Sequence, residues 1–393
     1  MIDIEILKKH EFIVIGFEHY NPLGVIRSLG ENGIRPIAII KKSDIRIASK
    51  SKYIKKLHIV ENDEEAMQIL LNYYQDKHNK PFVIPCDDNI TELLDVHYDE
   101  LNDFFYFSNA GENGRISNYM NKKEICNLAQ KNGINVPKSW VVQIGEIPSD
   151  ILYPVITKPI TSYPNWKADY HICENKEELI EAHKTIKTKT LMLQSYIKKV
   201  NELCLDGIVV NHGKDVMISI ASKYTYILPD YFSMEMNIFS LKDNKIKNYL
   251  SKMFEEIGYN GIFSAEFMID DNDNLWFLEI NFRNSTWSYA STKLGMNLPL
   301  LWASGQITGQ IEKNDYKEIP KNYVALAEVD DFEHRVKRLK MISPITWAKG
   351  VIRADCLFYW NIRDIKPVMS YWFGKISRFI NKKIGRYSCE KKR

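Results

Sequence analysis

The first 110 residues alternate short apolar runs with segments in which apolar residues recur every three or four positions. The runs predict β-strands, and the segments between them predict helices. The expected strands are 12–17, 36–40, 57–60, 82–85 and 104–107, and the expected helices are 23–32, 64–75 and 89–96. Such alternation is typical of a parallel sheet covered by helices. We therefore expect an α/β fold that begins with a doubly wound, Rossmann-like domain over residues 1–115.

After this region the pattern becomes richer in strands. Helices are expected over 121–133 and 241–257. The last two strand-like runs, 261–270 and 275–283, are joined by an Asp- and Asn-rich turn and predict a hairpin. We expect this part of the chain to be α+β.

Polar residues follow two of the expected strands in the first domain. His19 and Asn21 come after the first strand, and Asp87 and Asp88 come after the fourth. These side chains are candidates for small-molecule contacts, because ligands of open sheets bind beyond the carboxyl ends of the strands. A structural alternative is that 89–92 forms a capping box. The turn after the first strand lacks G-x-G-x-x-G spacing, which disfavours a nicotinamide-dependent dehydrogenase.

Composition narrows the class of protein. The 393 residues include 53 Lys and Arg against 50 Asp and Glu, a net charge of +3, so no nucleic-acid footprint covers the whole surface. The six cysteines form no C-x-x-C pair, which favours free thiols in a reducing compartment. No G-x-S-x-G or H-E-x-x-H motif supports a hydrolase or zinc enzyme. The early apolar run is too short for a signal peptide, and we expect a cytoplasmic protein.

The expected hairpin carries the strongest chemical signal. Side chains alternate along a strand, so Glu279 and Asn281 point to one face, and hairpin pairing can bring Glu266 beside them. Two carboxylates on one buried face repel each other unless a cation lies between them. Oxygen ligands without His or Cys suit Mg²⁺ or Mn²⁺.

Lys158 is the second chemical signal. It interrupts the apolar run YPVITKPI, where a lysine needs an anionic partner such as a phosphate. The structural alternative is a solvated edge of a sheet.

Together these motifs resemble the ATP-grasp superfamily over residues 1 to about 310. The matching segments are the N-K pair ending at Lys122, Y-P-V-I-x-K-P with Lys158, LMLQSYI, and F-x-A-E-F followed by F-L-E-I-N-F-R. The resemblance implies an ATP-grasp domain over 116–310, with an N-lobe at about 116–197 and a C-lobe at about 198–310. It also implies ATP and two Mg²⁺ (or Mn²⁺) ions as cofactors. The implied metal ligands are Glu266, Glu279 and Asn281, and the implied ATP contacts are Lys122 and Lys158 at the phosphates, Gln194, Ser195, Tyr196 and Ile197 at adenine, and Glu202 at the ribose.

Within the superfamily the sequence is similar to carboxylate-amine ligases of the D-aspartate ligase type. The similarity lies in residues 158–167 and in the segment from Phe277 to Pro299. It implies that ATP activates a small-molecule carboxylate as an acylphosphate, and that an amine then displaces phosphate to give an amide and ADP. Arg283 and Lys158 are the implied catalytic residues. For Arg283 the alternative is a salt bridge to a nearby acid such as Glu279.

One departure from the family pattern motivates a different function. Residues 159–170 contain no glycine, whereas a glycine-rich loop covers the γ-phosphate in most ATP-grasp enzymes. We expect Ser162, Trp166 and Lys167 to replace that loop. The alternative is a non-catalytic ATP-binding relative that acts as an interaction or regulatory protein.

The remaining residues, 311–393, are expected to form a C-terminal extension with a basic tail. Residues 366–393 hold nine Lys and Arg against Glu390, a net charge of +8, so the remainder of the chain carries −5. Apolar residues at helical spacing predict a basic amphipathic helix, broken by Gly374 and Gly385. This helix either docks on the protein body or lies at an anionic membrane surface, which would suit an envelope precursor as substrate. No nucleic-acid partner is expected.

Overall fold

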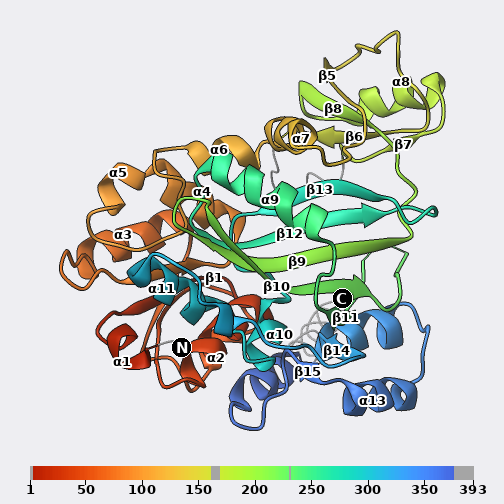
Figure 1. Ribbon diagram of the computed structural model, residues 1–393. Helices are drawn as coiled ribbons and strands as arrows, with labels where there is room; N and C mark the ends of the chain where they lie inside the picture. Colours follow the sequence, from red (N-terminus) through yellow and green to blue (C-terminus); the bar gives the residue numbers. More distant parts are fainter. Residues whose placement is uncertain (1–2, 161–168, 230–231, 376–393) are drawn as a thin grey trace, which may run out of the picture.

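The computed structural model describes residues 3–160, 169–229 and 232–375, which form three sheets with their covering helices (Figure 1). The expected phosphate-covering residues Ser162, Trp166 and Lys167 lie outside the described residues, as do 376–393 of the tail.

The first sheet is parallel, with strand order β3-β2-β1-β4. Its strands are β1 (Phe12–Gly16), β2 (Ile37–Lys41), β3 (Lys56–Val60) and β4 (Phe82–Pro85), and its main helices are α2 (Tyr20–Gly30), α3 (Asp63–Tyr73) and α4 (Asp88–Val96). Alternate residues of β1 enter different cores, because Phe12 and Val14 pack on one face and Ile13 and Ile15 on the other. Both faces of the sheet are therefore covered, as predicted for a doubly wound domain.

Short elements complete this part of the chain. They are α1 (Ile4–Leu7), η1 (Ala48–Lys50), α5 (Tyr98–Leu101) and α6 (Arg115–Met120). The strand predicted over 104–107 is wrong, since the segment makes only an isolated bridge between Tyr106 and Phe82. The predicted capping box at 89–92 is also wrong. The helix begins two residues earlier, because the Asp87 carboxylate accepts a hydrogen bond from the amide of Ile90 (3.1 Å).

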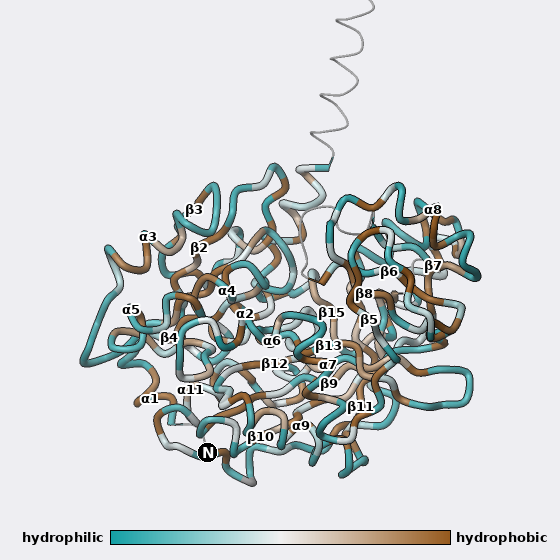
Figure 2. Tube along the Cα trace, turned by 90° about the horizontal axis from the view of Figure 1, so that it is seen from above, coloured by the Kyte–Doolittle hydropathy of each residue, from teal (hydrophilic) through white to brown (hydrophobic). Residues whose placement is uncertain are grey.

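A small lobe stands apart at the top of Figure 1. It contains the antiparallel sheet β5-β8-β6-β7 and helix α8, and α7 leads into it. The bounds are α7 (Lys122–Lys131), β5 (Ser139–Gln143), β6 (Val155–Pro159), β7 (Ile172–Cys173), α8 (Lys176–Thr185) and β8 (Thr190–Ser195). The lobe has its own core, which includes Val142, Val155 and Leu179. Hydrophobic segments run through the interior of the lobe and of the main body, with hydrophilic loops outside (Figure 2).

The third sheet is the largest, with strand order β13-β12-β9-β10-β11-β14-β15. The strands are β9 (Asn201–Val210), β10 (Asp215–Tyr224), β11 (Glu235–Phe239), β12 (Gly261–Ile269), β13 (Leu275–Asn281), β14 (Tyr323–Leu326) and β15 (Cys356–Leu357). One face packs against α9 (Asn244–Ile257), while α10 (Ser288–Lys293) and α11 (Leu298–Thr308) pack between this sheet and α2. Strand β13 lies at the sheet edge below the small lobe.

The C-terminal segment folds back onto the first domain. Its elements are η3 (Lys313–Asp315), α12 (Glu328–Asp331), the π-helix η4 (Phe332–Arg338), α13 (Pro344–Arg353) and a helix that starts at residue 366. Val368 and Tyr371 join the same core as Leu23 of α2. The last helix continues through Gly374 to residue 375, so the predicted break at Gly374 is wrong.

A buried ion pair fixes this segment to α2. Arg27 and Asp364 are fully buried, and the guanidinium Nε donates to the carboxylate at 3.1 Å. Arg27 also donates to the carbonyl oxygens of Phe358 (2.8 Å) and Tyr359 (3.0 Å). The Asp364 carboxylate accepts further bonds from the Ser51 hydroxyl and the Lys52 amide. All the charge in this buried pair is therefore hydrogen-bonded, as such pairs require.

Candidate active site

The hairpin of β12 and β13 brings the predicted metal ligands together. Glu266 lies opposite Glu279, and Asn281 lies opposite Ser264. The Asn281 amide donates to Glu266 Oε1 at 2.9 Å. All three side chains share one face, because the strand period is two and the register changes only beyond Glu266.

The electrostatics of this face favour a bound cation. Burial raises the pKa of Glu266 well above its usual range, and repulsion from Glu279 and Glu202 adds to the rise. Burial also raises the pKa of Glu279, although Lys122 and Arg283 oppose the shift. Carboxylates held together in this way ionise readily only beside positive charge.

The donor set of this face fits a hard divalent cation, since it offers carboxylate and amide oxygens only. Over the described ranges, no group of three or more His, Cys, Asp or Glu side chains is placed to hold a metal. The predicted set contains two carboxylates and an amide, so it needs further oxygen ligands from outside the protein, such as phosphate or water.

Lys158 faces this region from the small lobe. It lies on β6, which pairs with β8 on one side and β7 on the other, so the alternative of a solvated edge is wrong. Its side chain is 8% exposed and donates to Gln194 Oε1 at 2.7 Å. Burial lowers the pKa of Lys158 to about 8. A buried lysine whose partner is a neutral amide is poised to receive an anion.

Lys122 adds positive charge near Lys158. It is the first residue of α7, and its charge lowers the pKa of both Lys158 and Glu279. Burial raises the pKa of Cys126, one turn further along α7. Lys158 and Lys122 oppose this rise, and Glu279 adds to it. The two lysines therefore lie near each other and near Glu279.

The predicted adenine segment lies where β8 leaves the small lobe. Two of its amides are engaged by the backbone, since Ser195 N–H donates to the Lys138 carbonyl (2.8 Å) and Tyr196 N–H to the Pro154 carbonyl (2.9 Å). Contacts from Gln194 to Ile197 to an adenine must therefore use other atoms, unless these hydrogen bonds break.

The predicted ribose residue, Glu202, is buried on β9 beside the acidic face. Its Oε2 accepts from Lys199 and its Oε1 from the Tyr224 hydroxyl, each at 2.7 Å. A ribose hydroxyl would compete with or extend these contacts. Lys199 and Tyr224 were not predicted, because neither belongs to a motif.

Arg283 connects the hairpin to the first domain. Its guanidinium forms a two-pronged pair with Asp88, from Nε to Oδ1 at 2.7 Å and from Nη2 to Oδ2 at 3.2 Å. Nη2 also donates to Asn281 Oδ1 at 3.0 Å. The alternative of a salt bridge with a nearby acid is thus observed, with Asp88 in place of Glu279 as the partner. This contact joins Asp88, which lies shortly after the end of β4, to Arg283, which lies shortly after the end of β13.

The other polar residues predicted at the strand ends have local structural roles. His19 caps α2, and burial together with Arg283 lowers its pKa to about 4. Asn21 donates to the carbonyl oxygens of Cys86 and Asn284. Asp87 caps α4 and pairs with Lys41 at 3.1 Å.

One acidic residue on the sheet face that carries Glu266 and Glu279 was not predicted from the sequence. Asp206 follows Glu202 on the same face of β9 and is fully buried. It accepts hydrogen bonds from the hydroxyls of Ser285 and Ser288, and burial raises its pKa to about 6. The period of two along β9 places Asp206 on the same face as Glu202 and Cys204, and this pattern could have predicted it.

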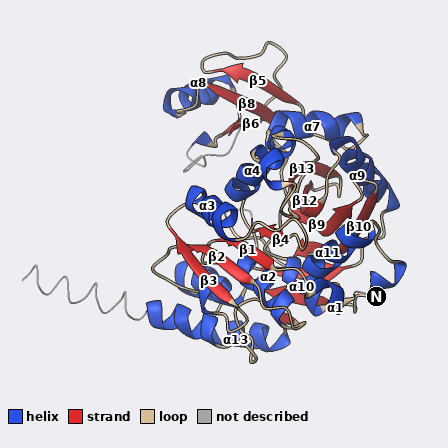
Figure 3. Cartoon of the chain, turned by 90° about the vertical axis from the view of Figure 1, so that its left-hand side faces the viewer, coloured by secondary structure: helices blue, strands red, loops and turns tan. Residues whose placement is uncertain are grey.

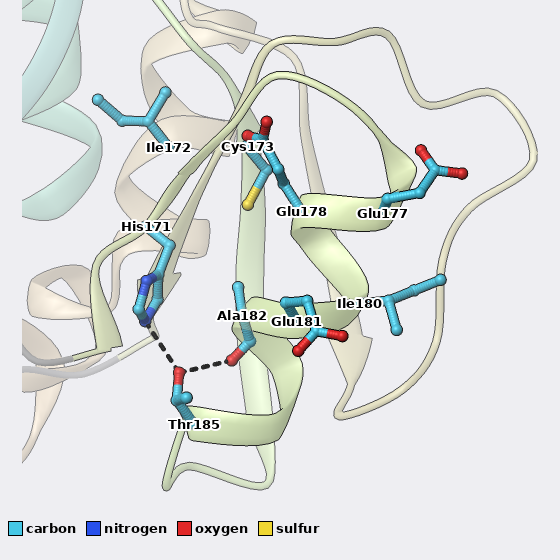
Figure 4. A pocket seen from close by; sticks show the side chains of 9 residues that line it. All are labelled: His171, Ile172, Cys173, Glu177, Glu178, Ile180, Glu181, Ala182 and Thr185. Carbon is cyan, nitrogen blue, oxygen red and sulfur yellow. Dashed lines mark hydrogen bonds between the residues drawn. The ribbon is translucent and has the colours of Figure 1, made fainter.

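A hollow of the surface lies away from this face. An open hollow of about 580 Å³ is formed by β7 and α8 of the small lobe (Figure 4). It is lined by His171, Cys173 and a row of exposed glutamates, and the His171 ring approaches the Thr185 hydroxyl at 3.4 Å. It contains none of the predicted site residues.

The architecture is that of the ATP-grasp fold, as predicted. Solved structures share the architecture at low sequence identity. N5-carboxyaminoimidazole synthetase from Staphylococcus aureus superimposes with a TM-score of 0.62 at 15% identity, covering 84% of this chain and 86% of that chain. L-amino acid ligase from Bacillus licheniformis gives 0.59 at 13%, covering 80% and 78%. The biotin carboxylase domain of 2-oxoglutarate carboxylase from Hydrogenobacter thermophilus, solved with MgADP, gives 0.60 at 18%, covering 78% and 72%.

Sequence comparison gives a similarity at low identity. The chain is similar to D-aspartate ligase from Enterococcus faecium, with 22% identity over 272 residues that cover 60% of this chain. The match spans 61% of the length of that curated relative. No model of a known protein family matches the chain. Among the described residues, none of the helices has the length and apolar character that a membrane crossing needs.

Proposed function

We propose that this protein is an ATP-dependent carboxylate-amine ligase. The observation that carries the proposal is the half-buried pair Glu266 and Glu279, held with Asn281 on one sheet face and approached by Lys158 and Lys122. Acidic and basic groups arranged in this way suit a nucleotide triphosphate and its divalent cation. Similarity to D-aspartate ligase and the ligases among the structural relatives supports the same reaction.

In this proposal Glu266, Glu279 and Asn281 hold Mg²⁺ or Mn²⁺, and two ions are bound together with ATP. Such ions neutralise phosphate charge and polarise the transferring phosphoryl group. Lys122 and Lys158 contact the phosphates. The segment 194–197 contacts adenine, and Glu202 contacts the ribose.

The proposed reaction has two steps. A substrate carboxylate oxygen attacks the γ-phosphorus of ATP, which forms an acylphosphate and releases ADP. The substrate amine then attacks the acyl carbon, phosphate leaves, the amine loses a proton, and an amide remains. Lys158 remains fully charged once it faces phosphate, and so contributes fixed positive charge where negative charge is transferred.

Arg283 orients the substrate in this scheme. Its two-pronged contact with the Asp88 carboxylate has the geometry with which a guanidinium binds any carboxylate or acylphosphate. Asp88 is half exposed, so a substrate group can replace it. We propose that substrate binding exchanges Asp88 for the substrate carboxylate.

The substrates in this proposal are a small carboxylate compound and an amine, one of them an amino acid such as D-aspartate. A cell-envelope precursor is the proposed second substrate class. We also propose a division into residues 1–115, 116–310 and 311–393, a cytoplasmic location, and a peripheral membrane contact through 366–393.

A screen of ADP and phosphate release with pairs of carboxylates and amino acids tests the ligase proposal. Glu279→Ala and Lys158→Ala should each abolish amide formation while the protein stays folded. Glu181→Gln, on the exposed side of α8, is the matched control and should keep full activity. Mg²⁺-dependent ATP binding without turnover of any pair would favour the non-catalytic alternative, and wild-type turnover by Glu279→Ala would refute the ligase mechanism.

A further inference from the structure

The C-terminal segment exposes an unusual number of large apolar side chains. Helix α13 buries none of its residues. Ile345 and Ile352 on this helix are 71% and 84% exposed, and Ile362 in the following loop is 86% exposed. The exposed large apolar residues between positions 341 and 373 are Met341, Ile345, Ile352, Trp360, Ile362, Met369 and Phe373. Large apolar side chains that are exposed within so short a stretch of the chain indicate an interaction surface.

These residues belong to elements that pack side by side. The ring centroids of Trp347 in α13 and Phe332 lie 4.8 Å apart. Those of Phe332 and Trp372 in the last helix lie 5.9 Å apart. Val368 and Tyr371 face the core, which leaves Met369 and Phe373 of that helix outside. Figures 1 and 3 both place α13 and the last helix at the same end of the molecule.

The part of this segment from residue 337 onward is basic, although Lys337 and Lys375 both pair with Glu333 just before it. Residues 337–375 hold eight Lys and Arg, at 337, 338, 340, 349, 353, 363, 366 and 375, against Asp355 and Asp364. Asp364 is buried and paired with Arg27, so it adds no negative charge to the surface. Lys349, Arg353, Arg363 and Lys366 are all exposed. We use the name basic apolar face for Ile345, Ile352, Ile362, Met369 and Phe373 together with these four basic residues.

We propose that the basic apolar face docks the protein on an anionic lipid bilayer. Aliphatic and aromatic side chains flanked by Lys and Arg match the boundary between acyl chains and acidic headgroups. The charge selects this occupant over others. Residues 376–393 contain seven Lys and Arg against Glu390, so the chain's own tail has the same sign as the face and adds to its attraction for a negative surface. The same faces of two copies would repel each other for the same reason.

This surface deepens the membrane contact proposed above for 366–393, because it places a folded, described surface beside the tail. It does not depend on the ligase activity. A protein that docks at a bilayer would bring its site near substrates carried on lipid.

Co-sedimentation of the full chain with vesicles tests the proposal. Vesicles of equal parts phosphatidylcholine and phosphatidylglycerol should bind the protein at about 0.05 M salt and release most of it at about 0.5 M. Pure phosphatidylcholine should bind weakly. The double variant Ile352→Glu/Ile362→Glu should weaken binding at least about tenfold, and Lys349→Glu/Arg353→Glu should do the same through charge. Leu152→Glu, at an equally exposed apolar site in the small lobe (69% exposed), should bind like wild type.

The Ile352→Glu/Ile362→Glu and Lys349→Glu/Arg353→Glu variants should keep the circular dichroism spectrum and the ATP binding of the wild type. These two measurements distinguish a failed ligase proposal from a failed membrane proposal. Absence of vesicle binding by the full chain would overturn the inference. So would binding that the Ile352→Glu/Ile362→Glu variant retains but that disappears on removal of 376–393. A dimer that this variant converts to monomer, or duplex DNA binding, in either case without vesicle binding, would assign the face to another occupant.

Discussion

Replacing Lys158 with methionine should abolish turnover and yet stabilise the protein in the absence of nucleotide. The side chain is buried on β6, and its one described hydrogen-bond partner is the neutral amide of Gln194. Methionine has a similar length and no charge. The substitution therefore removes a buried positive charge without creating a large cavity.

The magnitude follows from the lowered pKa of Lys158, which falls from 10.5 to about 8 through burial. Each whole pKa step corresponds to about 1.4 kcal/mol, so the buried charge costs the folded protein about 3 kcal/mol at neutral pH. Loss of the bond to Gln194 offsets about 1 kcal/mol of the gain. We expect Lys158→Met to raise the free energy of unfolding by about 2 kcal/mol at pH 7.

The gain should depend on pH with a definite sign. Below pH 8 Lys158 is charged in both the folded and the unfolded state, so the full penalty is present. Between about pH 8 and 10.5 the folded protein releases the proton first, and wild-type stability therefore rises relative to the variant. The difference between the two proteins should shrink across this range.

Urea unfolding followed by circular dichroism at pH 7 and at about pH 9.5 measures both effects. Lys41→Met is the matched control, because Lys41 is paired with Asp63 at 2.9 Å and Asp87 at 3.1 Å and its pKa is raised by them. That variant should be destabilised by about 1–2 kcal/mol. Equal destabilisation of the two variants, or a Lys158→Met gain that does not change with pH, would refute the reasoning.

Three further predictions address other contacts. Asp88→Ala frees the Arg283 guanidinium and should lower KM for the carboxylate substrate several-fold in steady-state kinetics; a KM unchanged relative to wild type would exclude competition by Asp88. Glu266→Gln should eliminate Mg²⁺-dependent ATP binding in calorimetry while thermal stability without metal is kept or increased, because burial already raises the pKa of Glu266; a marked loss of stability would count against this account. Asp364→Ala leaves the Arg27 charge buried and unpaired and should cost about 3–5 kcal/mol in urea unfolding, whereas a loss below about 1 kcal/mol would show that water replaces the carboxylate.

Local patterns were enough to predict the hairpin that carries the candidate metal ligands. The period of two fixes Glu279 and Asn281 on one face, and the short turn at 270–274 fixes the strand opposite. Glu266 lies beside them, as expected, because it belongs to the same hairpin.

Contacts between distant segments could not be predicted. Asp88 and Arg283 are separated by 195 positions, and no periodicity links them. The same holds for Tyr224, whose hydroxyl reaches Glu202 from 22 positions away and depends on the pairing of β9 with β10. The wrong strand at 104–107 shows the opposite error: its aromatic residues favour a strand, but they pack at the end of the sheet and make a single bridge.

The C-terminal segment was the least predictable part of the chain. The helical spacing of its apolar residues suggested one docking face for the last helix. The face that packs on the core contains Val368, Tyr371 and the partly buried Trp372, whereas Met369 and Phe373 are exposed. Position in the fold decided which apolar residues were buried, because both sides of the helix carry them.

The ion pair between Arg27 and Asp364 has a consequence for synthesis of the protein. The two residues are 337 positions apart, and the ribosome adds roughly 5–20 residues per second, so the second partner emerges roughly 20–70 s after the first. During this time the nascent Rossmann-like domain carries a guanidinium whose native, fully buried environment does not yet exist. The pair can therefore form only after nearly the whole chain has emerged, and shortened chains that end before residue 364 should depend on chaperones or aggregate.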